Sequence, residues 1–417
     1  MNVDTPFKDD RKLGYLNSEG ADRPLKSPVS QNVLERARAY RLARLRTVLG
    51  EYDVAGLLLY DPVNIRYAVD CSNMGVWTAH NPMRYAMILT GGPGIMFEFK
   101  GCEHLNDGLD GIDELRNSIA WMFMAAGDKS HDRLNRWADE IAQTLREHGG
   151  GNLRLGVDRM EPEGVYALQS RGITIIDAGQ ITEIARAIKS ADEIELMRWT
   201  IRVCEAGMAR IYDHSVPGAT ETELWAHLHF ENARSGGDWL ETKLLTCGPN
   251  TKPWYRECSS RPCQKGEMIA FDTDMIGPYG YCADLSRSWT CGYTPMNDEQ
   301  RRIYSAARDQ IEHNLALIEP GLSFAEFNAK SWQIPPAYQP YRYSLAAHGV
   351  GMADEWPVIA LHPDFADSQS GTFEAGQVIC VESLIADAHS ESVKLETQVL
   401  ITHSGTERLD SFPWEDV

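Results

Sequence analysis

The sequence predicts a two-domain protein, with an α/β domain over residues 31–190 followed by an α+β domain over residues 191–417. Three observations lead to this prediction. The chain has 417 residues, which exceeds the usual size of one domain. In the first half, helix-like and strand-like segments alternate, as is typical of an α/β layer. In the second half, short strand-like segments follow one another between helices, which favours antiparallel strands beside segregated helices.

An extended arm is expected over residues 1–30, which contain Pro, Gly and charged residues without periodicity. Ser30 is placed to cap a helix, because apolar side chains recur at helical spacing from there to Leu49. The remaining elements expected in the α/β domain are strands at Ala55–Tyr60, Tyr85–Leu89, Ile95–Phe99, Leu153–Val157 and Ile173–Ile176, and helices near Asp132–His148 and Pro162–Ser170.

A single long amphipathic helix is predicted over residues 184–207, where it carries the chain across the domain boundary near residue 190. The elements expected after it are helices near Glu221–Ala233, Asn297–Leu317 and Phe324–Trp332, and strands at Met268–Thr273, Gly280–Trp289, Gln377–Leu384 and Lys394–Thr402.

The composition is that of a globular protein, with 43% hydrophobic and 24% charged residues. The formal net charge of -20 argues against nucleic acid as a partner, because phosphate repels such a surface. The first thirty residues contain no apolar core of a signal peptide, and the longest apolar runs are too short to span a membrane. Nine scattered cysteines without a CxxC pair indicate reduced thiols, and therefore a cytoplasmic protein.

Acidic residues lie on a predicted β-hairpin. Asp272 and Asp274 alternate on one strand, so their side chains are expected to share a face. The segment GPYG forms a turn, and pairing of the returning strand brings Asp284 beside them. Three carboxylates on one face repel one another unless a positive group lies between them. A solvated acidic hairpin is the alternative, but apolar neighbours such as Phe271 and Trp289 indicate a mostly buried one.

One histidine and two glutamates complete a set of ligand-type side chains. His348 is followed by two glycines in HGVG, so the backbone there is expected to pass close to another group. A lone histidine is more often a core residue than a ligand. Glu382 and Glu396 each lie within an apolar strand-like run, where an unpaired carboxylate is costly. With Asp272 and Asp284, they form a set that suits two divalent ions sharing bridging carboxylates.

These segments resemble those of the pita-bread dimetal hydrolases, a family that includes methionine aminopeptidases, proline dipeptidases, aminopeptidase P and creatinase. The matching segments are FDTDMIGPYGYCADLSRSW, HGVG, VICVES and LETQVLIT, and the likeness extends to DPVNIRYAV and AIKSADEIELMR. The resemblance implies a pita-bread catalytic domain over residues 191–417, a creatinase-like α/β domain before it, and a homodimer.

The chain departs from the peptidases at two positions. Trp254 and Asp354 stand where the peptidases carry histidines that bind the scissile carbonyl and shuttle protons, which argues against peptide hydrolysis. With DTD and GMADEWP, these departures resemble the DddP-type dimethylsulfoniopropionate (DMSP) lyases of marine bacteria, which cleave DMSP to dimethyl sulfide and acrylate. The resemblance implies that Asp354 is the catalytic base. It also implies a dinuclear centre, usually iron, held by Asp272, Asp274, Asp284, His348, Glu382 and Glu396.

The residue types suit this β-elimination. A carboxylate can remove the proton next to the substrate carboxylate if burial raises its pKa. The sulfonium is a cation without hydrogen-bond donors, for which aromatic faces are natural partners. Trp254 is expected to contact the substrate because of its family position, and Tyr343 to contact the substrate carboxylate. Core packing is expected for Tyr255 and Trp356.

Three functions remain open from the sequence. The first is a lyase that acts on a small zwitterionic sulfonium compound. The second is a hydrolase of the same fold, like a Xaa-Pro dipeptidase or creatinase. The third is a binding module without catalysis, against which the complete ligand set argues. The metal also remains open, because carboxylates with one histidine accept Fe, Mn, Zn or Co.

Overall fold

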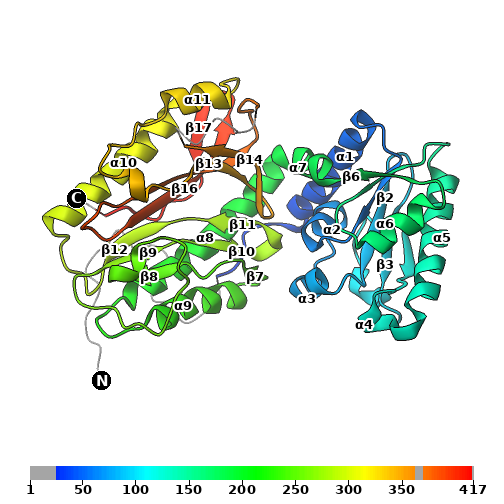
Figure 1. The fold of residues 1–417 in the computed structure, drawn as a ribbon, viewed down its shortest axis with the longest axis horizontal. Helices are drawn as coiled ribbons and strands as arrows, with labels where there is room; N and C mark the ends of the chain where they lie inside the picture. The colour runs from blue at the N-terminus through cyan, green and yellow to red at the C-terminus, as the bar shows by residue number, and fades with distance from the viewer. Residues whose placement is uncertain (1–24, 362–369, 416–417) are drawn as a thin grey trace. The chain divides into compact units, whose positions relative to one another are not determined.

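The computed structural model describes residues 25–361 and 370–415, which fold into two units (Figure 1). One unit is Ser30–Arg186, and the other begins at Ala187 and includes the described residues before Ser30. Most of the predicted N-terminal arm, residues 1–24, lies outside the described residues. None of the described helices is both long enough and apolar enough to cross a membrane.

The first unit is built on a six-stranded sheet with the order β4-β3-β2-β1-β5-β6. Strand β1 pairs in parallel with β5 and antiparallel with β2, so the sheet is mixed. Its strands are β1 Gly56–Leu59, β2 Tyr85–Leu89, β3 Gly94–Glu98, β4 Glu114–Asn117, β5 Arg154–Val157 and β6 Thr174–Asp177. Its helices are α1 Gln31–Glu51, α2 Pro62–Val69, α3 Gly75–His80, α4 Phe123–Ala126, α5 Ser130–His148, α6 Pro162–Gln169 and α7 Gly179–Ala187.

The core of this unit lies between the sheet and its covering helices. Figure 1 shows α5 on one side of the sheet and α1 and α2 on the other. Every side chain of β1, β2 and β3 is buried, as the apolar runs predicted. The predicted elements are confirmed to within a few residues, and Ser30 occupies the N-cap of α1, although its side chain makes no capping hydrogen bond. The polar strand β4 and the short helices α2, α3 and α4 were not predicted.

The single helix predicted over residues 184–207 is wrong. Helix α7 ends at Ala187, and a second helix, α8 (Ala191–Asp213), begins four residues later. Ser190 starts α8 with a capping box, in which its side chain accepts from the Glu193 amide while Glu193 bonds back to the Ser190 amide. These reciprocal bonds satisfy amides that a continuous helix would otherwise pair, so they favour a new helix start.

The second unit combines helices with antiparallel strands, which confirms the predicted α+β class. Its sheets have the orders β11-β10-β7, β12-β9-β8 and β14-β13-β15-β16-β17. The other helices are α9 Glu221–Arg234, α10 Asp298–Leu317 and α11 Phe324–Lys330. The strands are β7 Trp239–Leu240, β8 Leu245–Cys247, β9 Met268–Phe271, β10 Asp274–Ile276, β11 Cys282–Asp284, β12 Arg287–Thr290, β13 Leu345–Val350, β14 Asp354–Ala360, β15 Val378–Ile385, β16 Val393–Thr402 and β17 Gly405–Arg408.

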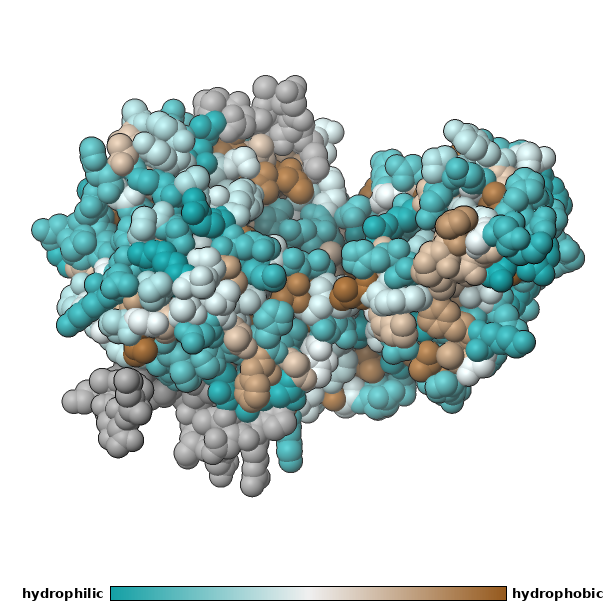
Figure 2. Space-filling view, turned by 60° about the horizontal axis from the view of Figure 1, so that its bottom comes forward, coloured by the Kyte–Doolittle hydropathy of each residue, from teal (hydrophilic) through white to brown (hydrophobic). Residues whose placement is uncertain are grey.

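Helices lie against these strands in two places (Figure 1). Helices α8 and α9 pack together beside the shorter strands, and α10 lies against β15 and β16. Strands β15 and β16 are almost wholly buried, so the glutamates within them lie inside the unit. The face shown in Figure 2 is mostly hydrophilic, in keeping with the net charge of -20, and carries apolar patches on the first unit.

The close backbone approach predicted at HGVG is confirmed. A Cβ atom at Gly349 would lie 2.4 Å from the Trp356 carbonyl oxygen on the neighbouring strand, and one at Gly351 would lie 2.4 Å from the Glu355 carboxylate. We expect Gly349→Ala to lower the free energy of unfolding by about 1–3 kcal/mol, the usual cost of overpacking. Thermal unfolding measures this effect. Gly91→Ala is the control, because its added Cβ meets nothing within 4 Å, and an equal melting temperature for both variants would contradict the expectation.

Candidate metal centre

Acidic side chains from four strands face one another in the second unit. Asp274 of β10 pairs directly with Asp284 of β11, and Glu382 of β15 pairs directly with Glu396 of β16. Strand β13, which carries His348, pairs with β15. Directly opposed residues in antiparallel strands have adjacent side chains. The sheets therefore bring these five predicted residues into one cluster.

Asp272 joins the cluster by a different route from the predicted one. The prediction of a single strand through Asp272 and Asp274 is wrong. Strand β9 ends at Phe271 and pairs with β12. Strand β10 begins at Asp274 and pairs with β11 in another sheet. The chain crosses between sheets at Asp272, whose amide donates to the Leu244 carbonyl at 2.8 Å. The Ser286 hydroxyl lies 2.6 Å from Asp272 Oδ1 and 2.8 Å from Glu396 Oε2, which holds the two carboxylates together.

His348 lies at the centre of the carboxylates. Its Nε2 atom is 3.2 Å from Asp284 Oδ2, 3.3 Å from Glu396 Oε1 and 3.7 Å from Glu382 Oε1. Its Nδ1 atom is 3.1 Å from the Gly349 carbonyl oxygen and 3.7 Å from Asp354 Oδ1. The ring therefore touches acids on both sides.

Burial and mutual repulsion change the pKa values of the clustered carboxylates. Burial raises the pKa of Asp272 to about 6 and that of Glu382 to about 7, and the Glu396 charge adds to both effects. Burial, with the neighbouring carboxylates, also holds the pKa of Asp274 and Asp284 well above the ordinary range. Burial alone would raise the pKa of Glu396, but Lys394 and His348 outweigh it and lower that pKa. The site thus concentrates carboxylates whose repulsion a cation would relieve.

The donor set fits divalent ions. Ligand-type atoms of Asp284, His348, Cys380 and Glu396 lie within 4.8 Å of one another, as do those of Asp274, Asp284 and Asp354. Asp284 belongs to both groups, as expected of a carboxylate that bridges two ions. Glu382 Oε1 is buried without a hydrogen-bond partner among the described residues, so a ligand-type oxygen is left free. Burial raises the pKa of Cys380 far above its usual value, which favours the protonated thiol in the metal-free protein.

Asp354 lies at the edge of this cluster, as the first residue of β14. Its side chain is 59% exposed, unlike those of the other acids. Desolvation by its neighbours raises its pKa, against the opposing effect of His348. A carboxylate oxygen of Asp354 also lies within 4.8 Å of carboxylate oxygens of Asp274 and Asp284. The structure therefore places Asp354 closer to the proposed metal ligands than the sequence indicated.

Lys394 is a member of the cluster that the sequence analysis missed. Its Nζ atom lies 2.9 Å from Glu382 Oε2, 3.0 Å from Glu396 Oε2 and 3.2 Å from Asp272 Oδ2. Burial by itself would lower the pKa of Lys394, but the three carboxylates outweigh it and raise that pKa well above its ordinary value. Lys394 is therefore a fixed positive charge. Strand alternation carries the signal, because Lys394 stands two residues before Glu396 and so shares its face.

We expect Lys394→Met to destabilise the metal-free protein by about 3–5 kcal/mol, because it leaves buried carboxylates without their cation. Thermal or urea unfolding in a chelating buffer measures this. Lys330→Met, which removes an exposed lysine, is the control and should change little. Equal stability of the two variants would show that Lys394 does not neutralise the acids.

A cavity of about 410 Å³ opens onto the acids. Tyr343 lines it, and Tyr255 donates a hydrogen bond to the Tyr343 hydroxyl at 2.5 Å. Tyr255 is exposed, so its expected place in the core is wrong, whereas Trp356 does pack against the core beside Phe324. The ring of Trp254 lies 6.0 Å from Lys394 Nζ, but it does not line the cavity in the described structure. The lining residues that the sequence analysis missed are Thr242, Leu244, Tyr255, Glu257 and Leu345.

Comparison with known proteins places the chain in a family. The sequence profile of metallopeptidase family M24 matches residues 195–403, which include every clustered acid and His348. The chain belongs to metallopeptidase family M24. Enzymes of this family use a dinuclear centre of divalent metal ions, and the donor set described above fits such a centre.

Two relatives within the family are substantially similar over most of their length. The dimethylsulfoniopropionate lyase DddP of Roseovarius nubinhibens is 38% identical over 390 residues, which cover 92% of this chain and 87% of that protein. The lyase of the same name from Roseobacter denitrificans is 37% identical with the same coverage. The Xaa-Pro dipeptidase of Pyrococcus furiosus is 24% identical over 54% of this chain and 63% of its own. The predicted resemblance to the DMSP lyases is thus confirmed.

Solved structures confirm the pita-bread fold. A Xaa-Pro dipeptidase from Bacillus anthracis matches with a TM-score of 0.71 and 20% identity, over 92% of this chain and 99% of that one. The prolidase from Pyrococcus furiosus matches with a TM-score of 0.70 and 18% identity, over 89% of this chain and all of that one. At such identities the likeness concerns the fold alone.

Proposed function

We propose that the protein is a metal-dependent DMSP lyase, which cleaves dimethylsulfoniopropionate to dimethyl sulfide and acrylate. The observation that carries this proposal is the half-exposed carboxylate of Asp354 at the rim of the metal centre, 3.7 Å from His348 Nδ1. A carboxylate in this place can accept a proton from carbon without a water nucleophile. The 38% identity to a DMSP lyase over 92% of the chain supports the same activity.

The elimination transfers one proton and breaks one bond. Asp354 takes the proton from the carbon next to the substrate carboxylate, and the electron pair of that C–H bond forms the C=C bond of acrylate. The C–S bond breaks at the same time, and its electrons leave on sulfur, so the sulfonium departs as neutral dimethyl sulfide. Burial raises the pKa of Asp354 in the metal-free protein, and a raised pKa favours proton acceptance by a carboxylate.

The proposed metal ligands are Asp272, Asp274, Asp284, His348, Glu382 and Glu396. When bound, two divalent ions supply positive charge for the substrate carboxylate and for the charge that develops beside it. Iron is the proposed metal by resemblance, with zinc, manganese or cobalt as alternatives. Lys394 positions three of these carboxylates by holding one oxygen of each, which leaves the second oxygen of Glu382 free.

The aromatic residues are proposed to hold the substrate. Tyr343 lines the cavity and is proposed to contact the substrate, with Tyr255 as its hydrogen-bond partner. Trp254 is proposed as an aromatic partner of the sulfonium, although it does not line the cavity in the described structure.

Three further features belong to the proposal. The catalytic domain is residues 191–417 and the creatinase-like domain residues 31–190, which the separation of two compact units at Arg186 supports. The protein is a homodimer by resemblance to the creatinase architecture. A cytoplasmic location is supported by the nine cysteines, all of which are free thiols.

The alternative is a Xaa-Pro dipeptidase-like or creatinase-like hydrolase, whose fold the solved dipeptidases share. Gas-phase detection of dimethyl sulfide, run beside a Xaa-Pro dipeptide assay and a metal analysis on the same preparation, separates the two. We expect dimethyl sulfide release with about two ions per chain. Dipeptide cleavage without dimethyl sulfide would overturn the lyase assignment, and neither activity in a metal-loaded sample would indicate a binding module.

A further inference from the structure

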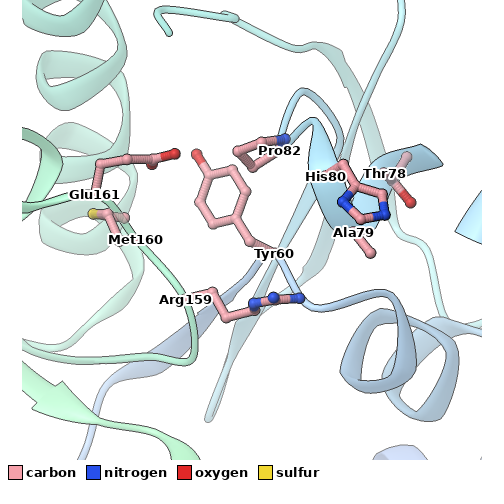
Figure 3. Close-up of a pocket in the computed structure, with 8 residues that line it drawn as sticks. All are labelled: Tyr60, Thr78, Ala79, His80, Pro82, Arg159, Met160 and Glu161. Atoms are coloured by element: carbon pink, nitrogen blue, oxygen red, sulfur yellow. The ribbon is translucent and has the colours of Figure 1, made fainter. Parts of the chain in front are cut away.

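A second cavity lies in the first unit, among residues 30–186, and takes no part in the proposed elimination. Its volume is about 250 Å³. Figure 3 shows the residues that line it, which are Tyr60, Thr78, Ala79, His80, Pro82, Arg159, Met160 and Glu161. They come from the segments that directly follow β1 and β5 and from the end of α3.

The position of this cavity in the sheet is one at which ligands bind. Strands β1 and β5 are parallel neighbours, so their carboxyl ends lie at the same edge. The strand that follows β1 in the chain, β2, lies on one side of this pair in the sheet. The strand that follows β5, β6, lies on the other side, so the strand order is β2-β1-β5-β6. In open α/β sheets such a divergence leaves a crevice outside the carboxyl ends of the strands, where ligands characteristically bind.

One carboxylate fixes the two walls of the crevice relative to each other. Asp158 accepts hydrogen bonds from the amides of Tyr60 at 2.8 Å, Asp61 at 3.0 Å and Arg159 at 2.7 Å, and from Asn64 Nδ2 at 3.1 Å. The loops after β1 and β5 therefore share a single acceptor. A site held in this way is organised before a ligand arrives.

Tyr60 is a buried residue of the cavity lining, and its hydroxyl has no hydrogen-bond acceptor among the described residues. The side chain is 5% exposed, and the hydroxyl makes no hydrogen bond to any described residue. Burial raises the pKa of Tyr60 well above its usual value, so the hydroxyl keeps a proton to donate. The neighbouring indole N–H of Trp137 can only donate, so it cannot accept the hydrogen of the Tyr60 hydroxyl. An unpaired buried hydroxyl is unfavourable, which indicates that something else completes the site.

Opposite charges line the two sides of the cavity. In the view of Figure 3, Glu161 lies on one side of the Tyr60 ring and His80 on the other, with Arg159 nearer to His80. Apolar atoms of Ala79, Pro82 and Met160 complete the lining. Arg159 Nη1 is 3.1 Å from Asp61 Oδ2, which fixes its guanidinium while leaving half of it exposed.

We propose that this cavity binds a small zwitterion, an organic carboxylate that also carries a quaternary ammonium or sulfonium group. The carboxylate lies toward Arg159 and His80, and the onium lies toward Glu161 and the Tyr60 ring. The apolar lining accommodates the methyl groups and short chain of such a molecule, and an aromatic ring beside a carboxylate is a favourable environment for an onium ion. The Tyr60 hydroxyl orients Glu161 or the ligand by donating its free hydrogen. The proposal does not depend on the lyase assignment.

The test uses glycine betaine as the probe, because it has the required charges and no leaving group for β-elimination. Calorimetry with the full chain measures its binding, alongside choline as a cation alone and propionate as an anion alone. We expect Glu161→Gln to weaken glycine betaine and choline about tenfold and to spare propionate, since it removes one charged contact. Arg159→Gln should weaken glycine betaine and propionate and spare choline.

Two controls keep the outcome decisive. Tyr60→Phe should abolish the rise in melting temperature that glycine betaine causes, without lowering the melting temperature of the free protein, because the hydroxyl donates to no described residue. The three variants should release dimethyl sulfide at the wild-type rate if the protein is a lyase. The absence of glycine betaine binding would overturn the proposal. So would binding that all three variants leave unchanged, because it would then lie elsewhere in the protein.

Discussion

Asp354→Asn is expected to lower the rate of dimethyl sulfide release about 10²–10⁴-fold, the usual effect of removing a general base. The amide has nearly the same shape as the carboxylate but cannot accept a proton from carbon. The fold should persist, because the side chain is half exposed at the start of β14. Exchange of the substrate's α-hydrogen with solvent deuterium should disappear together with turnover, and the metal content should be that of the wild type.

The metal measurement decides between two roles of this residue. Asp354 lies within 4.8 Å of Asp274 and Asp284, so it can also act as a ligand. If Asp354→Asn loses metal as well as activity, Asp354 is a ligand. If it keeps both, the base is another group, and Tyr343 is the next candidate. Asp298→Asn is the matched control, because it neutralises a fully exposed carboxylate at the start of α10.

Asp284→Ala is expected to empty the metal centre and to abolish activity. Asp284 belongs to both groups of ligand-type side chains, so its loss affects both ions. Inductively coupled plasma mass spectrometry after desalting gives the metal content per chain. The expected fall is from about two ions to almost none, as for removal of a bridging ligand.

A surface variant provides the comparison for this loss. Glu407 lies on the partly exposed strand β17, and its carboxylate pairs with Arg198. The Glu407→Ala protein should keep both its metal ions and its activity. Full activity in an Asp284→Ala protein shown to be free of metal would refute the metal-dependent reaction. Loss of activity with both ions still bound would instead place Asp284 in substrate binding.

Much of the site could be predicted because its residues interrupt apolar runs. Glu382 and Glu396 stand within buried strands that are rich in apolar side chains, where an unpaired carboxylate is costly. The crossing at Asp272 was not predictable in this way. The alternation of Asp272 and Asp274 is compatible with one strand, and only the pairing of β9 with β12 and of β10 with β11 separates them. Such pairing depends on contacts between distant parts of the chain.

Of two other errors, one had a signal in the sequence and the other had none. The break before α8 follows from Ser190 and Glu193, whose spacing is that of a capping box. The periodicity of the flanking segments outweighed that signal in the prediction. Tyr255 was assigned to the core because an aromatic residue is usually buried, but the cavity beside Tyr343 exposes its ring. The existence of a cavity depends on packing of the whole unit and has no local signature.

The buried ammonium of Lys394 has a consequence for how the protein matures. Six carboxylates converge on one small volume, and a chain that had to wait for metal before closing its sheets would expose β15 and β16 during synthesis. Lys394 is part of β16 itself, so the strand that brings Glu396 also brings a permanent counter-charge for three acids. The sheets can therefore close first and receive their ions afterwards. On this order of events, a shortage of metal in the cell yields folded, inactive protein that is ready to be loaded, rather than aggregated chains.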